Sequence, residues 1–235
     1  MAMIRIPAET RGLTKLDWLA SYHSFSFGDY YHPKKMGFGS LRVLNDDTVA
    51  PGKGFALHFH DNMEIITFVL EGSLEHKDST GGQGVLKAGQ MQRMTAGKGI
   101  QHSEFNPSKI ENVHFLQIWI HPQKLGLEPE YEQKEFAKLL KSNQLIPLVC
   151  PQKNKETLFI HQDALFYMAK MESGAAINYS VLSQKNGVYG FLIEGEIQIG
   201  QEVFQSKDAV AITQQKQFNF TAKRASHVLF IEIPV

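Results

Sequence analysis

Apolar and polar residues alternate in short runs along almost the whole chain, and Gly, Asn, Asp or Pro separates one run from the next. Residues 40–54, 64–79, 84–99 and 112–122 show this pattern most clearly and are rich in Val, Ile, Phe and Thr. Runs of this kind are typical of short β-strands joined by turns. The pattern therefore predicts an all-β protein built as a sandwich or barrel.

One stretch departs from this rhythm. Residues 129–143, PEYEQKEFAKLLKSN, place Phe136, Leu139 and Leu140 at helix-like spacing near the middle of the chain. Apolar residues three and four positions apart form one face of a helix. We expect a short helix here that connects two halves of the molecule.

The second half of the chain repeats the rhythm of the first. Residues 68–90 and 191–212 each contain an apolar strand, a Glu-Gly turn, a second strand, a Gly-containing turn and a third strand. An internal repeat of this kind indicates two related β-barrel domains. The predicted domains are an N-terminal barrel over residues 1–130, a connector with a short helix over 131–150, and a C-terminal barrel over 151–235.

Composition narrows the class of protein. The chain has 235 residues and a formal net charge of zero, so no basic surface attracts nucleic acid. Its one cysteine, Cys150, excludes an internal disulfide, and no signal sequence or long apolar segment is present. We expect a soluble, cytoplasmic protein that binds neither membranes nor nucleic acid directly. Closed barrels leave no long free edge, which favours a monomer.

Two histidine-containing pairs are the strongest candidates for chemistry. His58 and His60 stand two residues apart in a predicted strand, as do His102 and Glu104 in a later one. Side chains two apart on a strand share a face about 6.5–7 Å apart, so both pairs can reach one metal ion. Three imidazoles and a carboxylate suit iron, manganese, nickel, copper or zinc. Glu64 also shares the face of the first pair if that strand continues unbroken.

A single His-x-His pair is more often a surface or hydrogen-bonded pair than a metal site. The conjunction of two such pairs, each beside its own glycine-rich turn, favours a site in the first barrel. The second barrel carries only His161 and His227, far apart, and is expected to lack metal ligands. We expect the remaining histidines to be structural or solvent-facing: His23, His32, His76, His114, His121 and His161.

These segments resemble a known family. Residues 58–72, HFHDNMEIITFVLEG, and 94–106, MTAGKGIQHSEFN, are similar to the two cupin motifs in the form found in pirins. Residues 22–33, 116–136 and 160–170 are similar to pirin segments as well, so the resemblance covers essentially the whole chain. It is closer to bacterial pirin-like proteins with quercetin 2,3-dioxygenase activity than to human pirin.

The resemblance implies a bicupin with one metal site in its first barrel. Pirins take their carboxylate ligand from the second motif. The resemblance therefore implies His58, His60, His102 and Glu104 as ligands, with Fe(II) as the favoured ion. Glu104 is also a candidate base. Glu64 becomes a candidate acceptor that holds a ligand imidazole N–H.

The implied reaction opens a flavonol such as quercetin with O2 and releases carbon monoxide. A metal there would lower the pKa of the flavonol 3-hydroxyl. Apolar side chains should line the mouth of the site, and six candidates are Phe25, Phe27, Phe59, Phe105, Met91 and Met94. The alternative is a non-catalytic, redox-responsive metal protein that acts through a protein partner, as human pirin is thought to do.

Overall fold

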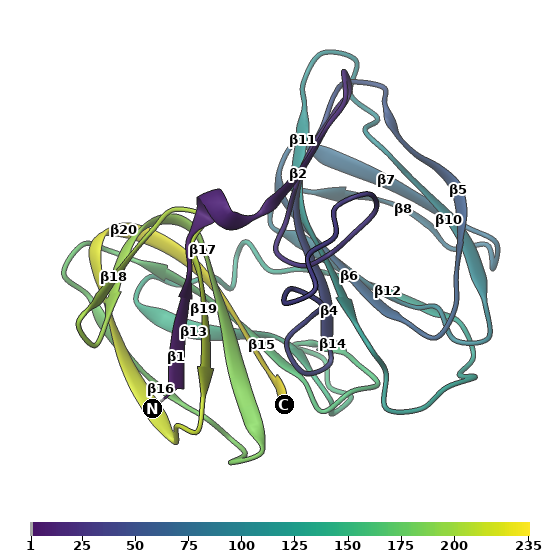
Figure 1. Cartoon of the computed structure of the whole chain (residues 1–235). Coiled ribbons are helices and arrows are strands. Elements are labelled where there is room, and N and C mark those ends of the chain that lie inside the picture. The colour runs from purple at the N-terminus through teal and green to yellow at the C-terminus, as the bar shows by residue number, and fades with distance from the viewer. Residues whose placement is uncertain (1) are drawn as a thin grey trace.

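The computed structural model describes residues 2–235, and its regular secondary structure is almost entirely β-strand. Figure 1 shows two barrels side by side, the first coloured purple to teal and the second green to yellow. The predicted all-β, two-barrel fold is confirmed. Within the described part of the chain, no helix is long and apolar enough to cross a membrane.

The first barrel is built from two sheets. The larger sheet contains β2 (Gly12–Lys15), β3 (Leu19–His23), β4 (Leu41–Val49), β6 (Glu64–Glu71), β9 (Gln90–Thr95), β11 (Val113–Ile120) and β12 (Glu130–Glu135). The smaller one contains β5 (Gly54–His60), β7 (Ser73–Asp78), β8 (Gln83–Lys87) and β10 (Ile100–Phe105). Their strand orders are β12-β9-β6-β11-β4-β3-β2 and β5-β10-β7-β8. Leu74 and Leu86 of the smaller sheet share a buried cluster with Val69 and Phe115 of the larger one, which joins the two sheets.

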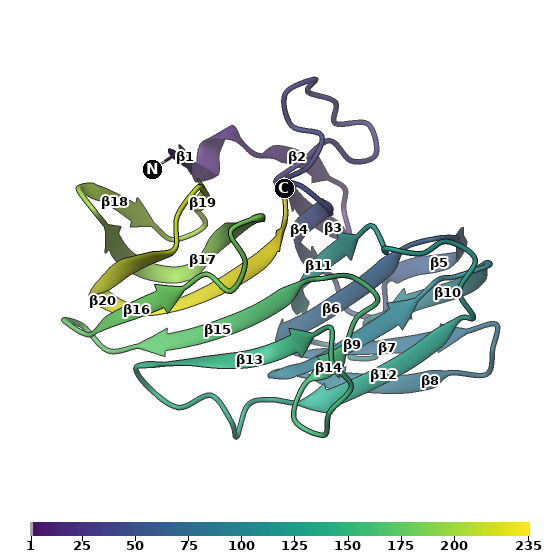
Figure 2. The same cartoon turned by 90° about the horizontal axis from the view of Figure 1, so that it is seen from below.

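The second barrel contains one nine-stranded sheet. Its strands are β1 (Ala2–Ile6), β13 (Gln144–Cys150), β14 (Leu158–Phe159), β15 (Leu165–Met171), β16 (Ala176–Ser180), β17 (Asn186–Ile199), β18 (Glu202–Gln205), β19 (Ala209–Thr213) and β20 (Gln217–Pro234). The N-terminal strand β1 pairs with β19, and a 3-10 turn, η1 (Ala8–Thr10), leads from it to the first barrel. Figures 1 and 2 both show this purple strand among the strands of the second barrel.

The outer face of the larger sheet packs on the second barrel. Phe68 and Leu116 share one buried cluster with Phe166, Leu229 and Ile231 from the other half of the chain. Strand β6 is therefore buried on both faces, which explains why its sequence is almost continuously apolar rather than strictly alternating. Neighbouring residues on this strand consequently face different barrels.

The predicted helix over residues 129–143 is wrong. Residues 130–135 form strand β12, which pairs antiparallel with β9 along the edge of the larger sheet. The helix-like spacing of Phe136, Leu139 and Leu140 spans one turn, in which the backbone N–H groups of Leu139 and Leu140 both donate to the oxygen of Phe136. The free edge of β9, which lies far from this segment in the sequence, supplies the hydrogen bonds that make residues 130–135 a strand.

The sheets also run across the expected boundaries at residues 130 and 150. Strand β12 extends the first barrel to Glu135, and β13 already belongs to the second barrel. The connector therefore shrinks to residues 136–143, and β1 lies outside the barrel to which its position in the chain would assign it.

Candidate metal centre

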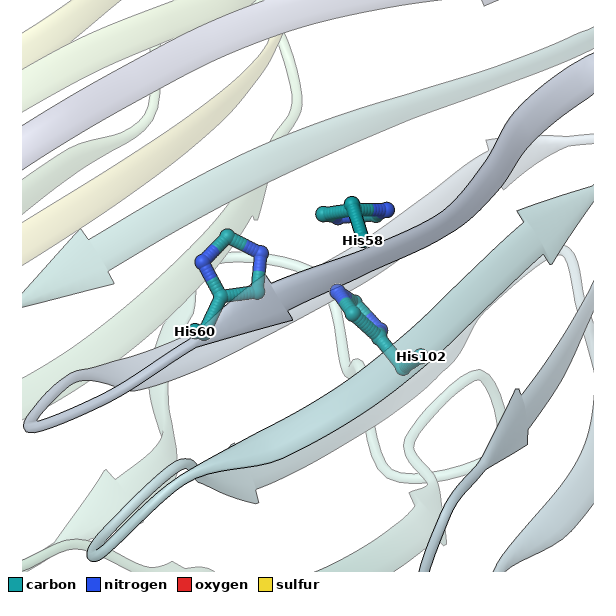
Figure 3. Close-up of side chains that lie close together, drawn as sticks. All are labelled: His58, His60 and His102. Atoms are coloured by element: carbon teal, nitrogen blue, oxygen red, sulfur yellow. The ribbon is translucent and has the colours of Figure 1, made fainter.

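Three histidines meet on one face of the smaller sheet. His58 and His60 lie on β5 and His102 on β10, and the two strands pair antiparallel with His58 opposite His102. Ring centroids are 4.4 Å apart for His58 and His102, 4.8 Å for His58 and His60, and 5.0 Å for His60 and His102. Figure 3 shows the three rings close together above neighbouring strands. Strand pairing thus brings together residues that the sequence separates by more than forty positions.

The ring nitrogens of this cluster are available to a metal ion. The Nε2 atoms of His60 and His102 are buried and lack a hydrogen-bond partner. His58 Nδ1 donates to the backbone oxygen of Ala56 at 2.7 Å, so that a neutral His58 keeps the lone pair on Nε2. Burial and the neighbouring imidazoles lower the pKa of His60 to about 4 and that of His102 to about 3. Neutral imidazoles with free nitrogens fit a divalent transition metal.

Glu104 lies two residues after His102 on the same strand, β10, and is buried. One nitrogen of His102 and one oxygen of Glu104 belong to a group of ligand atoms that all lie within 4.8 Å of one another, with His76 as the third member. The Glu104 carboxylate is buried and accepts hydrogen bonds from Gln92 Nε2 at 2.9 Å and Gln117 Nε2 at 2.7 Å. These donors come from β9 and β11 and hold the carboxylate inside the barrel. The pairing register of β10 with β5 shifts between His102 and Glu104. His102 lies opposite His58, whereas Glu104 lies opposite Phe55.

Glu64 lies apart from the three histidines. The first strand does not continue, because β5 ends at His60 and the chain turns at Asn62 with φ 47° before β6 begins. Burial raises the pKa of Glu64 to about 7, although the positive charge of Arg93 acts to lower it. The Glu64 carboxylate faces the backbone N–H of His161 in the second half of the chain. Among the described residues, the hydrogen bonds join Glu64 to His161 rather than to a ligand imidazole, and His58 Nδ1 donates to the Ala56 oxygen.

A cavity of about 210 Å³ adjoins the cluster, and His58 and Glu104 are part of its wall. Its apolar lining consists of Leu19, Phe27, Phe55 and Trp119. Of the six expected lining residues only Phe27 contributes. Phe25 and Met91 pack in the core between the barrels and Met94 in a smaller core cluster, while Phe59 points outward and is 58% exposed.

The opposite wall of the cavity is polar. His23 is buried there, with Nδ1 at 2.9 Å from Asn45 Oδ1 and Nε2 at 2.9 Å from Thr14 Oγ1. Asp47 is buried beside it, and burial raises the pKa of this carboxyl to about 7. The sequence signal for this wall was the polar triplet 45–47 within a largely apolar strand, because the first and third members of the triplet share a face.

Trp119 connects the apolar wall to the histidines. Its indole meets the His60 ring edge-on at a centroid distance of 4.8 Å and the Phe27 ring at 5.2 Å. The indole Nε1 is buried without a hydrogen-bond partner. A buried donor of this kind is available to an oxygen atom of a ligand.

The turn between β9 and β10 depends on a glycine with no room for a side chain. Gly97 has φ +52°, and a Cβ there would lie 2.0 Å from the backbone oxygen of Leu127. We expect Gly97→Ala to destabilise the protein by about 2 kcal/mol or more, because a left-handed conformation and a backbone clash add. The melting temperature should then fall by roughly 4–8 °C.

Gly52→Ala is the matched control for this prediction. Gly52 has φ +65°, but nothing lies within 4 Å of the added Cβ. It carries only the conformational cost, of roughly 1 kcal/mol. Equal melting temperatures for the two variants would show that the contact with Leu127 does not constrain the turn.

Two barrels, three inward-facing imidazoles and a buried carboxylate in one of them define a metal-binding bicupin. Among residues 2–235, both groups of three clustered metal-ligating side chains lie in the first barrel. Residues 7–120 match the family model Pirin, and residues 148–233 match the Quercetinase C-terminal cupin domain.

The chain belongs to the pirin family. It is 38% identical over 227 residues to the quercetin 2,3-dioxygenase of Escherichia coli strain K12, which covers 97% of this chain and 96% of that protein. The crystal structure of the bacterial pirin YhhW from Escherichia coli in complex with nickel(II) has a TM-score of 0.94 at 36% identity and covers 99% of both chains. GK1651 from Geobacillus kaustophilus shares the fold, with a TM-score of 0.79 at 22% identity over 100% of this chain and 98% of that one.

Proposed function

We propose that this protein is a metal-dependent dioxygenase that opens flavonols such as quercetin with O2 and releases carbon monoxide. The observation that carries the proposal is the cluster of His58, His60 and His102 beside an aromatic-lined cavity. The name of the Escherichia coli relative, quercetin 2,3-dioxygenase, supports the same reaction class.

The proposed ligands are His58, His60, His102 and Glu104. Fe(II) is the favoured ion, and manganese, nickel, copper and zinc suit the same nitrogen and oxygen donors. The nickel(II) complex of the bacterial pirin YhhW supports binding of a divalent ion in this family. Such an ion supplies Lewis acidity and, where it is redox-active, electron transfer between substrate and O2.

The chain's own groups would bind and orient the flavonol. Phe27, Phe55 and Trp119 offer an apolar wall for its flat rings. The free Nε1 of Trp119 is a donor for a flavonol oxygen. Glu104 is positioned by Gln92 and Gln117 and would accept the proton of the 3-hydroxyl.

The test is aerobic quercetin turnover by protein loaded separately with Fe(II), Mn(II), Ni(II), Cu(II) and Zn(II). Flavonol absorbance and released carbon monoxide are followed together. We expect carbon monoxide in proportion to the quercetin consumed with at least one redox-capable ion. If every metal-loaded form leaves quercetin unchanged, the dioxygenase proposal is wrong and the redox-responsive regulatory role becomes the better explanation.

We expect the active species to be a cytoplasmic monomer.

A further inference from the structure

His76 is a buried histidine that the proposed ligand set does not use. It lies on β7, which pairs with β10, and its side chain has no exposed surface. Its ring stacks on that of Tyr131 from β12, with centroids 4.6 Å apart and planes at 21°. Packing between two sheets therefore fixes the plane of this imidazole. A fully buried polar ring needs partners for both nitrogens.

Asp78 holds one of those nitrogens. Its Oδ1 accepts hydrogen bonds from the backbone N–H groups of Thr80 at 2.8 Å and Gly82 at 3.0 Å, and from the Thr80 hydroxyl at 2.6 Å. Its Oδ2 lies 2.9 Å from Nε2 of His76. Because an ionised carboxylate only accepts hydrogen bonds, the proton between them sits on His76 Nε2.

The second nitrogen of His76 faces His102. The two Nδ1 atoms are 3.5 Å apart, the long limit of a hydrogen bond in which one nitrogen donates and the other accepts. A neutral His76 that carries its proton on Nε2 has a bare Nδ1 and can only accept. The proton between the rings therefore sits on His102 Nδ1. Nε2 of His102, which is buried and without a partner, then carries the lone pair.

We propose that Asp78 and His76 form a positioning relay that presents His102 Nε2 to the metal ion. The chain of contacts runs from the Asp78 carboxylate through both nitrogens of His76 to Nδ1 of His102. It fixes the tautomer and the ring angle of His102 and increases its donor strength. The inference rests on the ligand set proposed above, but not on the reaction.

The same contacts argue against His76 as a ligand itself. His76, His102 and Glu104 have ligand atoms within 4.8 Å of one another and could be mistaken for a second metal site. Both nitrogens of His76 are already committed, one to Asp78 and one to His102. A metal ion bound by His76 would have to displace one of these contacts inside a buried site.

Asp78→Asn tests the relay with almost no change in shape. The three donors from Thr80 and Gly82 keep the amide oxygen at the Oδ1 position, so the amide NH2 faces His76 Nε2. His76 must then accept there and donate from Nδ1, which leaves His102 protonated on Nε2. We expect the affinity for Ni(II), measured by competition with a chelator, to fall by about 10–100-fold.

Glu75→Gln is the matched control on the same strand. Glu75 pairs with Lys77 at 2.9 Å on the outer face of β7, away from His76, and its substitution should leave Ni(II) affinity unchanged. An Asp78→Asn variant that is folded, with native affinity, would overturn the relay. If the wild-type protein binds no Ni(II), or if His58→Ala binds it as tightly, the proposed ligand set fails instead.

The nitrogen-15 NMR spectrum of the metal-free wild-type protein tests the tautomers without any substitution. We expect His102 to carry its proton on Nδ1 and His76 on Nε2. A spectrum with the His102 proton on Nε2 contradicts the relay even if Asp78→Asn fails to fold. This readout distinguishes the relay from a purely structural role, because packing alone does not select a tautomer.

Discussion

Replacing His58 and His60 together by alanine will remove metal binding and quercetin turnover in one step. Both residues lie on β5 with their rings 4.8 Å apart, and they supply two of the four proposed ligands. If the binding free energy resembles the roughly 10–16 kcal/mol of four-ligand zinc sites, each ligand carries on the order of 3 kcal/mol. Loss of two ligands should then weaken binding by about 10⁴-fold.

The fold should survive this double substitution. Both imidazoles line the inner mouth of the barrel and are only half-buried, so their removal leaves the apolar core intact. Metal content by mass spectrometry and melting temperature should be measured on the same samples. His121→Ala is the control, because His121 is exposed and follows β11 outside the cluster. Metal retained by a folded double variant would place the binding site elsewhere.

Local periodicity was sufficient to find the histidines. A strand places residues two apart on one face, and the glycine turns on either side of His58 and His102 marked where each strand begins. The pairing of β5 with β10 needed only that these strands be neighbours in a barrel. The resemblance to pirins added the choice of Glu104, which strand parity alone left open against Glu64.

Features that depend on distant pairing could not be predicted in the same way. The polar edge strand β12 was mistaken for a helix because its partner β9 lies about forty residues earlier. Glu64 stayed open as a neighbour of His58 because nothing local revealed that the strand ends at His60. In both cases the deciding hydrogen bonds come from elsewhere in the chain.

The partners of the histidines were missed for a related reason. His76 and Asp78 form the same two-apart pattern that identified His58 and His60, but His76 was expected to be structural or solvent-facing. Trp119 lies on a strand that is buried along most of its length, so its unpartnered Nε1 could not be distinguished from ordinary packing. The roles of all three residues depend on side chains from other strands, which the local sequence does not reveal.

Replacing Glu104 by glutamine will separate the carboxylate's charge from its shape. Its Oε1 accepts from Gln92 Nε2 at 2.9 Å and Thr67 Oγ1 at 3.2 Å, and its Oε2 from Gln117 Nε2 at 2.7 Å. A glutamine amide must turn its NH2 toward one of these donors. The mismatch should cost about 1–3 kcal/mol of stability. The variant is therefore expected to fold, with a lower melting temperature.

The larger effect of Glu104→Gln should be on catalysis. Loss of a base that takes the flavonol proton should lower kcat by about 10²–10⁴-fold. Metal affinity should fall less than in the double histidine variant, because three imidazoles remain. Glu111→Gln, an exposed acid outside the site, is the control. Native kcat in a folded, metal-loaded Glu104→Gln variant would rule out the carboxylate as the base. A folded variant that no longer binds the metal would instead assign Glu104 to the ligand set.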